Sequence, residues 1–257
     1  MSLTRQAVTR GFISPHNRWY DVLLPWGLTG SAWIVLLLAT STKGLILFDH
    51  DYLLRVSHLP WLLALALFLL LWQVMIMAMM LPTSISVIAL LAQGSEQKRQ
   101  IWGRQAIFIA GYALTWTLFA LIAFLGDMLL HWLVHQWFWL YLHSYFIGSV
   151  ILVIAGIVQL LPYKKNSLHR CTEFHALIRQ QPLPGAGYAI LLGVRYGLLC
   201  IGSCWALMLV MVGLGMRNLV MMALLTAIVM IEKELPGGQR LRPIFGLALL
   251  ALAAFLL

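Results

Sequence analysis

Long apolar runs alternate with short polar stretches along the whole chain. The runs are continuous instead of alternating at every second residue, which predicts helices that cross a bilayer and argues against a membrane barrel. The second run is too long for one straight span, and Pro82 is expected to kink it. The last run is short for a full crossing. About seven spans are predicted, at residues 22–47, 61–92, 107–130, 141–161, 189–214, 219–231 and 243–257.

Composition supports the same fold class. Hydrophobic residues make up 62% of the chain and charged residues 10%, with a mean hydropathy of +0.90. Such a chain cannot cover itself with polar groups in water, and in lipid only helices or closed barrels pair every backbone group. We therefore expect an all-α transmembrane bundle over residues 21–257, in contact with the lipid bilayer, after a cytoplasmic or interfacial segment at residues 1–20.

Basic residues indicate the orientation of the bundle. If the N-terminus is cytoplasmic, only Lys43, Arg55 and Arg217 of the 17 Lys and Arg residues fall on the outer side. This is the positive-inside bias of multi-pass membrane proteins. The formal charge of +9 is therefore explained by short cytoplasmic loops, and we expect no nucleic-acid partner.

Sulfur side chains form a stripe in the fifth predicted span. At about 100° per residue, Cys200, Cys204, Met208 and Met211 fall within an arc of about 80° on one helix face. Thiols and thioethers are soft ligands that favour Cu(I) over hard cations. The alternative is that these residues only pack as apolar side chains.

The second predicted span carries methionines at a similar depth. Met75 and Met79 share one helix face, and Met77 and Met80 share another. We predict that Met77 and Met80 join the sulfur stripe around a copper ion. Ordinary close packing of the two helices is again the alternative.

Two further groups of residues have alternative interpretations. His131 and His135 are one helical turn apart and are candidates for an outer metal site, although aromatic neighbours favour an interfacial belt. Arg195 and Glu232 are expected near the cytoplasmic ends of their spans as a structural ion pair, or alternatively as an ion relay. Recognised catalytic motifs such as a phosphate-binding loop are not found, so an enzyme is not favoured.

Several segments together resemble a bacterial family of predicted metal-binding integral membrane proteins, a domain of unknown function. The resemblance covers roughly residues 72–236, and its specific part is the cysteine–tryptophan segment Cys200–Met208. The weaker matching segments are Trp72–Pro82, Gln159–Lys164, Gly193–Gly197, Gly215–Leu219 and Glu232–Pro236. The resemblance implies metal binding in a multi-pass protein of the bacterial inner membrane.

This chain departs from that family at two places. Similar members commonly carry a third cysteine where Ser203 lies, and a cysteine pair where this chain has Ser167 and Cys171. Fewer thiols weaken the expected metal site or shift it towards methionine ligands.

Three functions are compatible with these features. The first is a copper-binding membrane protein that holds the ion or passes it to a membrane partner or a metal-accepting protein. The second is a non-catalytic structural subunit of a membrane complex. The third is an intramembrane enzyme or ion-translocating subunit that uses Arg195 and Glu232.

Overall fold

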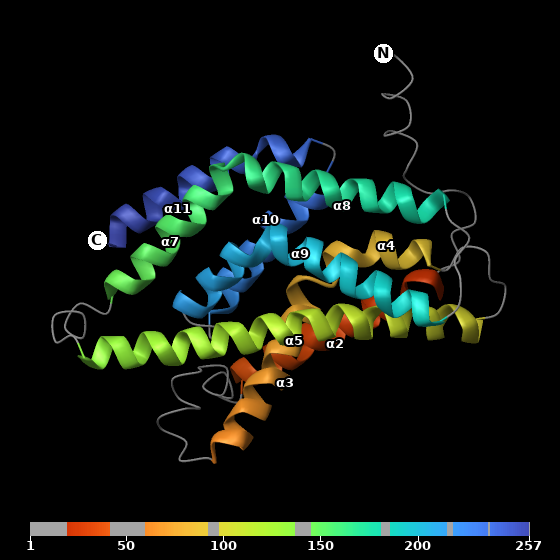
Figure 1. The fold of residues 1–257 in the computed structure, drawn as a ribbon, viewed down its shortest axis with the longest axis horizontal. Helices are drawn as coiled ribbons and strands as arrows, with labels where there is room; N and C mark the ends of the chain where they lie inside the picture. The colour runs from red at the N-terminus through yellow and green to blue at the C-terminus, as the bar shows by residue number, and fades with distance from the viewer. Residues whose placement is uncertain are drawn as a thin grey trace.

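The computed structural model describes residues 20–41, 60–91, 98–136, 145–180, 186–214, 218–235 and 237–256. All regular elements in these residues are helices, and Figure 1 shows their arrangement. The longer elements are α2 (Tyr20–Ser41), α3 (Trp61–Met79), α4 (Ile85–Leu90), α5 (Lys98–Gln136), α7 (Tyr145–Leu160), α8 (Pro162–Gln180), α9 (Ala186–Leu214), α10 (Leu219–Glu234) and α11 (Arg242–Leu256).

The second apolar run is broken where Pro82 predicts a kink. The α3 helix ends at Met79, a short 3-10 turn covers Pro82–Ser84, and α4 follows. The hydroxyls of Thr83 and Ser84 donate to the Met80 carbonyl at 2.8 and 3.1 Å. These bonds satisfy a backbone group that the break would otherwise leave unpaired inside the protein.

Two polar stretches are more helical than the apolar pattern indicates. The α5 helix extends the third predicted span at both ends, into the basic stretch that begins at Lys98 and into the aromatic linker up to Gln136. The polar stretch after the fourth predicted span forms α8, which meets α7 at a 63° bend. Apolar periodicity missed these extensions because two of them are polar and the third is a short mixed aromatic segment, and helix formation there depends on packing against neighbours.

Among the described residues, four helices are long and apolar enough to cross a membrane, within Val22–Ser41, Trp61–Met79, Arg99–Val134 and Gly187–Val212. The count becomes five if the bent α7–α8 pair is one span, and α11 is a shorter apolar helix. The seven crossings and the cytoplasmic N-terminus remain predictions.

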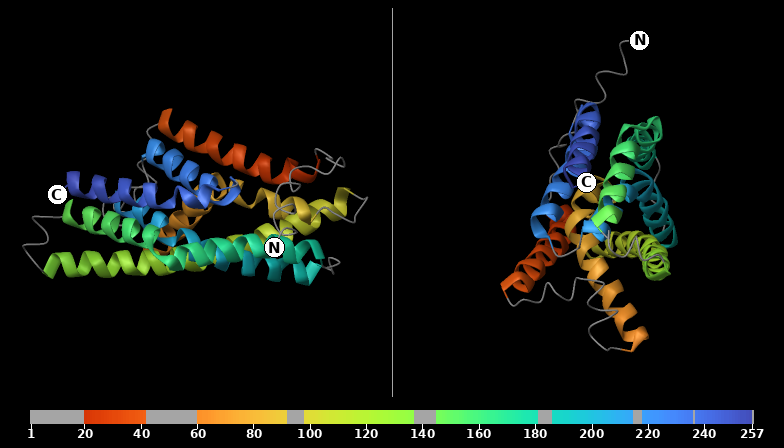
Figure 2. Two further views of the ribbon diagram at one scale, coloured as in Figure 1. Left: turned by 90° about the horizontal axis from the view of Figure 1, so that it is seen from above. Right: turned by 90° about the vertical axis from the view of Figure 1, so that its left-hand side faces the viewer.

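The α5 and α9 helices pack against each other and form the most extensive contact between the described helices (Figure 1). They approach so closely because glycines face the contact. A Cβ at Gly193 would lie 2.1 Å from the Phe108 carbonyl oxygen, and one at Gly111 would lie 2.3 Å from the Ile190 carbonyl oxygen. Figures 1 and 2 also show α11 beside α7, where Gly156 and Gly246 allow a similar approach. Small residues therefore set the close packing of α9, which carries the sulfur stripe, against α5.

Candidate functional site

The sulfur stripe of α9 points into the protein core. Cys200, Cys204, Met208 and Met211 are all buried and belong to one cluster with residues of α3 and α5. The helical spacing that predicts a shared face thus places the four side chains along the interior side of α9.

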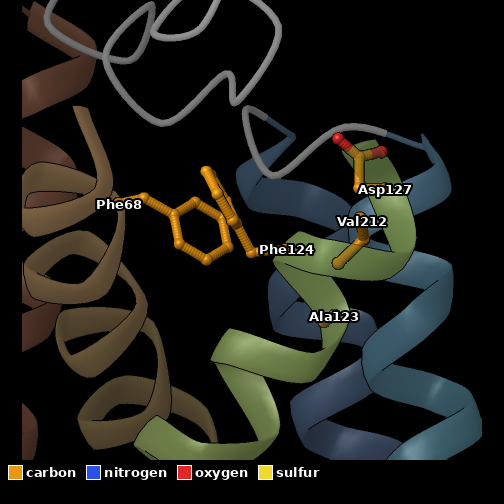
Figure 3. Close-up of a pocket in the computed structure, with 5 residues that line it drawn as sticks. All are labelled: Phe68, Ala123, Phe124, Asp127 and Val212. Carbon is orange, nitrogen blue, oxygen red and sulfur yellow. The ribbon is translucent and has the colours of Figure 1, made fainter. Parts of the chain in front are cut away.

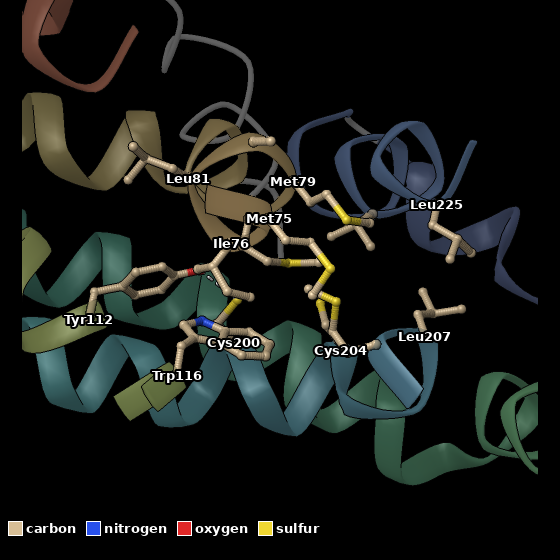
Figure 4. Close-up of a cluster of buried hydrophobic side chains, with 14 of the residues drawn as sticks. Met75, Ile76, Met79, Leu81, Tyr112, Trp116, Cys200, Cys204, Leu207 and Leu225 are labelled. Atoms are coloured by element: carbon tan, nitrogen blue, oxygen red, sulfur yellow. Dashed lines mark hydrogen bonds between the residues drawn. The ribbon is translucent and has the colours of Figure 1, made fainter. Parts of the chain in front are cut away.

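Methionines of α3 enter the same space. Figure 4 shows Met75 turned from α3 towards the side of α9 that carries Cys204, while the Met79 side chain extends towards Leu225 of α10. Both methionines are buried. The bundle therefore brings thiols of α9 and thioethers of α3 into one hydrophobic interior.

The two methionines predicted as ligands are placed differently from each other. Met80 is fully buried at the end of α3, whereas Met77 is only partly buried and packs against the margin of the cluster. Their role as ligands remains a prediction.

Polar groups from two other helices surround the Cys200 sulfur. The Lys233 ammonium, near the end of α10, donates to Cys200 Sγ at 3.0 Å. The Tyr112 hydroxyl of α5 lies 3.2 Å from the same sulfur. A cation and a hydroxyl at these distances favour negative charge on the sulfur, which is the form that binds metal ions.

A serine occupies the remaining polar position beside the two thiols. The Ser203 hydroxyl donates to the Cys200 carbonyl at 2.9 Å and lies 3.3 Å from Cys204 Sγ. Cys171 and Ser167 are buried on α8, and the Ser167 hydroxyl lies 3.0 Å from where a Cβ at Gly202 would be. Ser167 and Cys171 thus lie on the buried face of α8, and Ser203 lies beside the thiols on α9.

Glu232 forms a buried ion pair, with a partner other than the predicted one. Its carboxylate lies 2.7 Å from the ammonium of Lys164, at the start of α8, and the two side chains are 1% and 2% exposed. The Gln159 amide bonds to both groups. The side chain of Arg195, by contrast, lies on the exposed face of α9. The predicted pair of Arg195 with Glu232 is therefore wrong, because the bend between α7 and α8 turns Lys164 inward onto α10.

Glu234 is held on the other side of Lys233. The Ser86 hydroxyl of α4 lies 3.1 and 3.3 Å from the two carboxylate oxygens. Burial raises the pKa of the Glu234 carboxyl above its ordinary value, while the Ser86 hydrogen bond and the Lys233 charge act in the opposite direction. The three consecutive charged residues that end α10 thus have three different partners.

The candidate outer site cannot be described at the level of side chains. His131 and His135 lie in the last turns of α5, one helical turn apart as predicted. Their side chains are outside the described part of the structure, so their role as ligands remains a prediction.

A recess opens beside other members of the same buried cluster (Figure 3). It is lined by Phe68 of α3, by Ala123, Phe124 and Asp127 of α5, and by Val212 of α9. These lining residues carry no sulfur and one carboxylate, so the recess offers little to a soft metal ion.

The arrangement suits a monovalent soft metal. Among the described residues, no group of three or more His, Cys, Asp and Glu side chains could hold a metal ion. The core instead combines two thiols with thioethers, the ligand types that select Cu(I).

Sequence reasoning missed Lys233, Tyr112 and Lys164 as neighbours of the site. Lys164 and Lys233 each follow an apolar run, where the sequence indicates a solvated residue, whereas Tyr112 lies inside the third predicted span, where the sequence indicates ordinary packing. The one signal in the sequence that pointed to Lys233 was the family resemblance of the segment Glu232–Pro236. Its charged residues are buried or partly buried in the bundle.

Comparison with protein-family models places most of the chain in a known family. Residues 69–256 match a family model described as "PpoB2: Copper chaperone". No curated protein and no solved structure matches the chain.

Proposed function

The chain belongs to the PpoB2 copper chaperone family, and from this premise we propose that it is a membrane-embedded protein that binds Cu(I) between α3 and α9. Cys200 and Cys204 supply the thiolates, and Met75 or Met79 supplies a thioether. The ion is held for transfer to a metal-accepting partner in or at the same membrane.

The observation that carries this proposal is the convergence of sulfur side chains from two helices (Figure 4). Cys200, Cys204, Met75 and Met79 are each no more than 2% exposed. A Cu(I) ion needs only two or three soft ligands, and thiolates with thioethers favour it over hard cations.

The charges near the thiols also support the proposal. Two thiolates around one Cu(I) leave a net charge of −1, which is costly to bury without compensation. Lys233 and Tyr112 both lie within hydrogen-bond reach of Cys200 Sγ and would stabilise that charge. Residues that donate to metal ligands commonly tune metal affinity in this way.

Membrane location is supported by the apolar helices. Four helices are long and apolar enough to cross a bilayer, and they include α3 and α9, which carry the sulfur residues. We propose that the protein is a multi-pass protein of the bacterial inner membrane. Its site would then lie within the bilayer, where a copper-accepting membrane protein could reach it.

Copper binding to purified protein tests the proposal. The detergent-solubilised protein is loaded with Cu(I) without oxygen, and the bound copper is measured by mass spectrometry and by competition with a chromogenic chelator. We expect about one Cu(I) per chain, and at least about a 100-fold loss of affinity in Cys200→Ser/Cys204→Ser. Equal and negligible copper in both proteins would reject the proposal.

A matched pair of variants on α3 tests the thioether ligand. Met75→Leu/Met79→Leu removes the two candidate thioether ligands, and Met77→Leu/Met80→Leu removes the other two methionines of this segment at similar volume. We expect only Met75→Leu/Met79→Leu to lower Cu(I) affinity, by about tenfold. The same variant should shorten the mean Cu–S distance measured by X-ray absorption, because the ion then has fewer sulfur ligands. A loss of Cu(I) affinity confined to Met77→Leu/Met80→Leu would show that the thioether ligand is Met77 or Met80.

A further inference from the structure

Lys233 has a charge that no neighbouring carboxylate pairs with directly in the described structure. Its flanking residues bind elsewhere: the Glu232 carboxylate lies 2.7 Å from Lys164 Nζ, and the Glu234 carboxylate accepts from Ser86 at 3.1 and 3.3 Å. The Lys233 ammonium instead donates to Cys200 Sγ at 3.0 Å. The positive charge is thus directed at one of the two thiols.

This fixed charge distinguishes metal ions by their valence. A monovalent ion with two thiolates has a net charge of −1, and Lys233 brings the assembly to neutrality. A divalent ion with the same two thiolates is already neutral, so Lys233 gains no comparable attraction from that complex. Charges interact strongly in a buried site, and Lys233 therefore favours the complex of the monovalent ion.

We propose that Lys233 makes the Cys200–Cys204 site selective for monovalent Cu(I) and Ag(I) over divalent ions such as Zn(II). This inference rests on the proposed function, since it requires that the two thiols hold the metal. Beyond that function, the inference names Lys233 as the residue that determines which class of ion the site accepts.

A second lysine, which is fully buried, shows why this role falls to the partly buried Lys233. Lys164 is 2% exposed, but it is paired with Glu232 and bonded to Gln159. That pair is neutral as a unit and does not change the charge of the site. Lys233 is the cation placed in hydrogen-bond contact with a proposed ligand.

The experiment measures a ratio of affinities. Cu(I), Ag(I) and Zn(II) affinities are determined for the detergent-solubilised protein under reducing, oxygen-free conditions, in the parent and in Lys233→Met. Deprotonation of the two thiols is common to all three ions, so its contribution cancels in the ratio. We expect Lys233→Met to lower the preference for Cu(I) and Ag(I) over Zn(II) by about 100-fold, since a unit charge about 4 Å away acts at least this strongly at an effective dielectric constant near 20.

Two controls accompany this variant. Lys165→Met removes an exposed lysine from α8 and should leave the ratio unchanged. Lys233→Arg keeps the positive charge and should keep most of the preference. If Lys233→Met does not fold, Lys233→Gln removes the charge with a polar side chain and is measured in its place.

The outcomes separate the two proposals. If the parent binds Cu(I) through its thiols and the charge-removing variant keeps the parental ratio, the inference is overturned while the proposed function holds. If the parent binds no Cu(I), or binds it equally without Cys200 and Cys204, the proposed function fails and the inference fails with it.

Discussion

Replacing one member of the Lys164–Glu232 pair should lower the free energy of unfolding far more than replacing both. The two charges lie 2.7 Å apart and are almost completely buried. Glu232→Gln leaves the Lys164 ammonium without a counter-charge, and Lys164→Met leaves the Glu232 carboxylate without one. The double variant removes both charges and retains an amide at position 232 to bond with Gln159.

The expected magnitude follows from the burial of both groups. Removing one partner of a buried ion pair costs about 3–5 kcal/mol in the free energy of unfolding, because the other charge stays in a low-dielectric interior. Removing both charges is often close to neutral, so we expect the double variant within about 2 kcal/mol of the parent. The coupling energy between the two positions should therefore exceed about 2 kcal/mol.

The assay is a double-mutant cycle on the purified protein in mixed micelles. Unfolding is followed by circular dichroism during a denaturant titration for the parent, both single variants and the double variant. The matched control repeats the cycle with Arg195→Met in place of Lys164→Met. Arg195 is exposed, so this change should cost less than about 0.5 kcal/mol and should not couple to position 232.

Two results would refute this reasoning. One is a coupling energy below about 0.5 kcal/mol between positions 164 and 232, which is the scatter of independent sites. The other is a larger coupling of position 232 to Arg195 than to Lys164. A Glu232→Gln variant that keeps its stability but loses an ion-dependent activity would instead favour the ion-translocation hypothesis.

Two further predictions concern the contact of α5 with α9. Gly193→Ala should lower the free energy of unfolding by about 3 kcal/mol in the same titration, because its Cβ would lie 2.1 Å from the Phe108 carbonyl oxygen, whereas Gly187→Ala has no neighbour within 4 Å and should be neutral or slightly stabilising. Tyr112→Phe should weaken Cu(I) binding by about tenfold in the chelator competition, since it removes a hydroxyl 3.2 Å from a proposed ligand sulfur. Tyr196→Phe is its control, because that buried hydroxyl donates to a backbone carbonyl, and equal effects of the two variants would contradict the prediction.

The sequence determined the features that depend on one helix at a time. Continuous apolar runs predict helices because a bilayer or a buried core leaves the backbone no other partner than itself. Pro82 predicts the break between α3 and α4 because proline lacks an amide hydrogen and clashes with the preceding turn. The common face of Cys200, Cys204, Met208 and Met211 follows from helical periodicity, and all four are buried as that face requires.

Only the tertiary structure decided which residues meet. The 63° bend after α7 turns Lys164 towards Glu232, and the close approach of α5 to α9 brings Tyr112 to Cys200. Lys233 ends an apolar helix, where the sequence indicates a solvated residue, yet its ammonium reaches the thiol at 3.0 Å. Periodicity fixes the direction of a side chain around its own helix axis. The partner that a charge or thiol finds depends on how several helices bend and pack, which arises from contacts distant in the sequence.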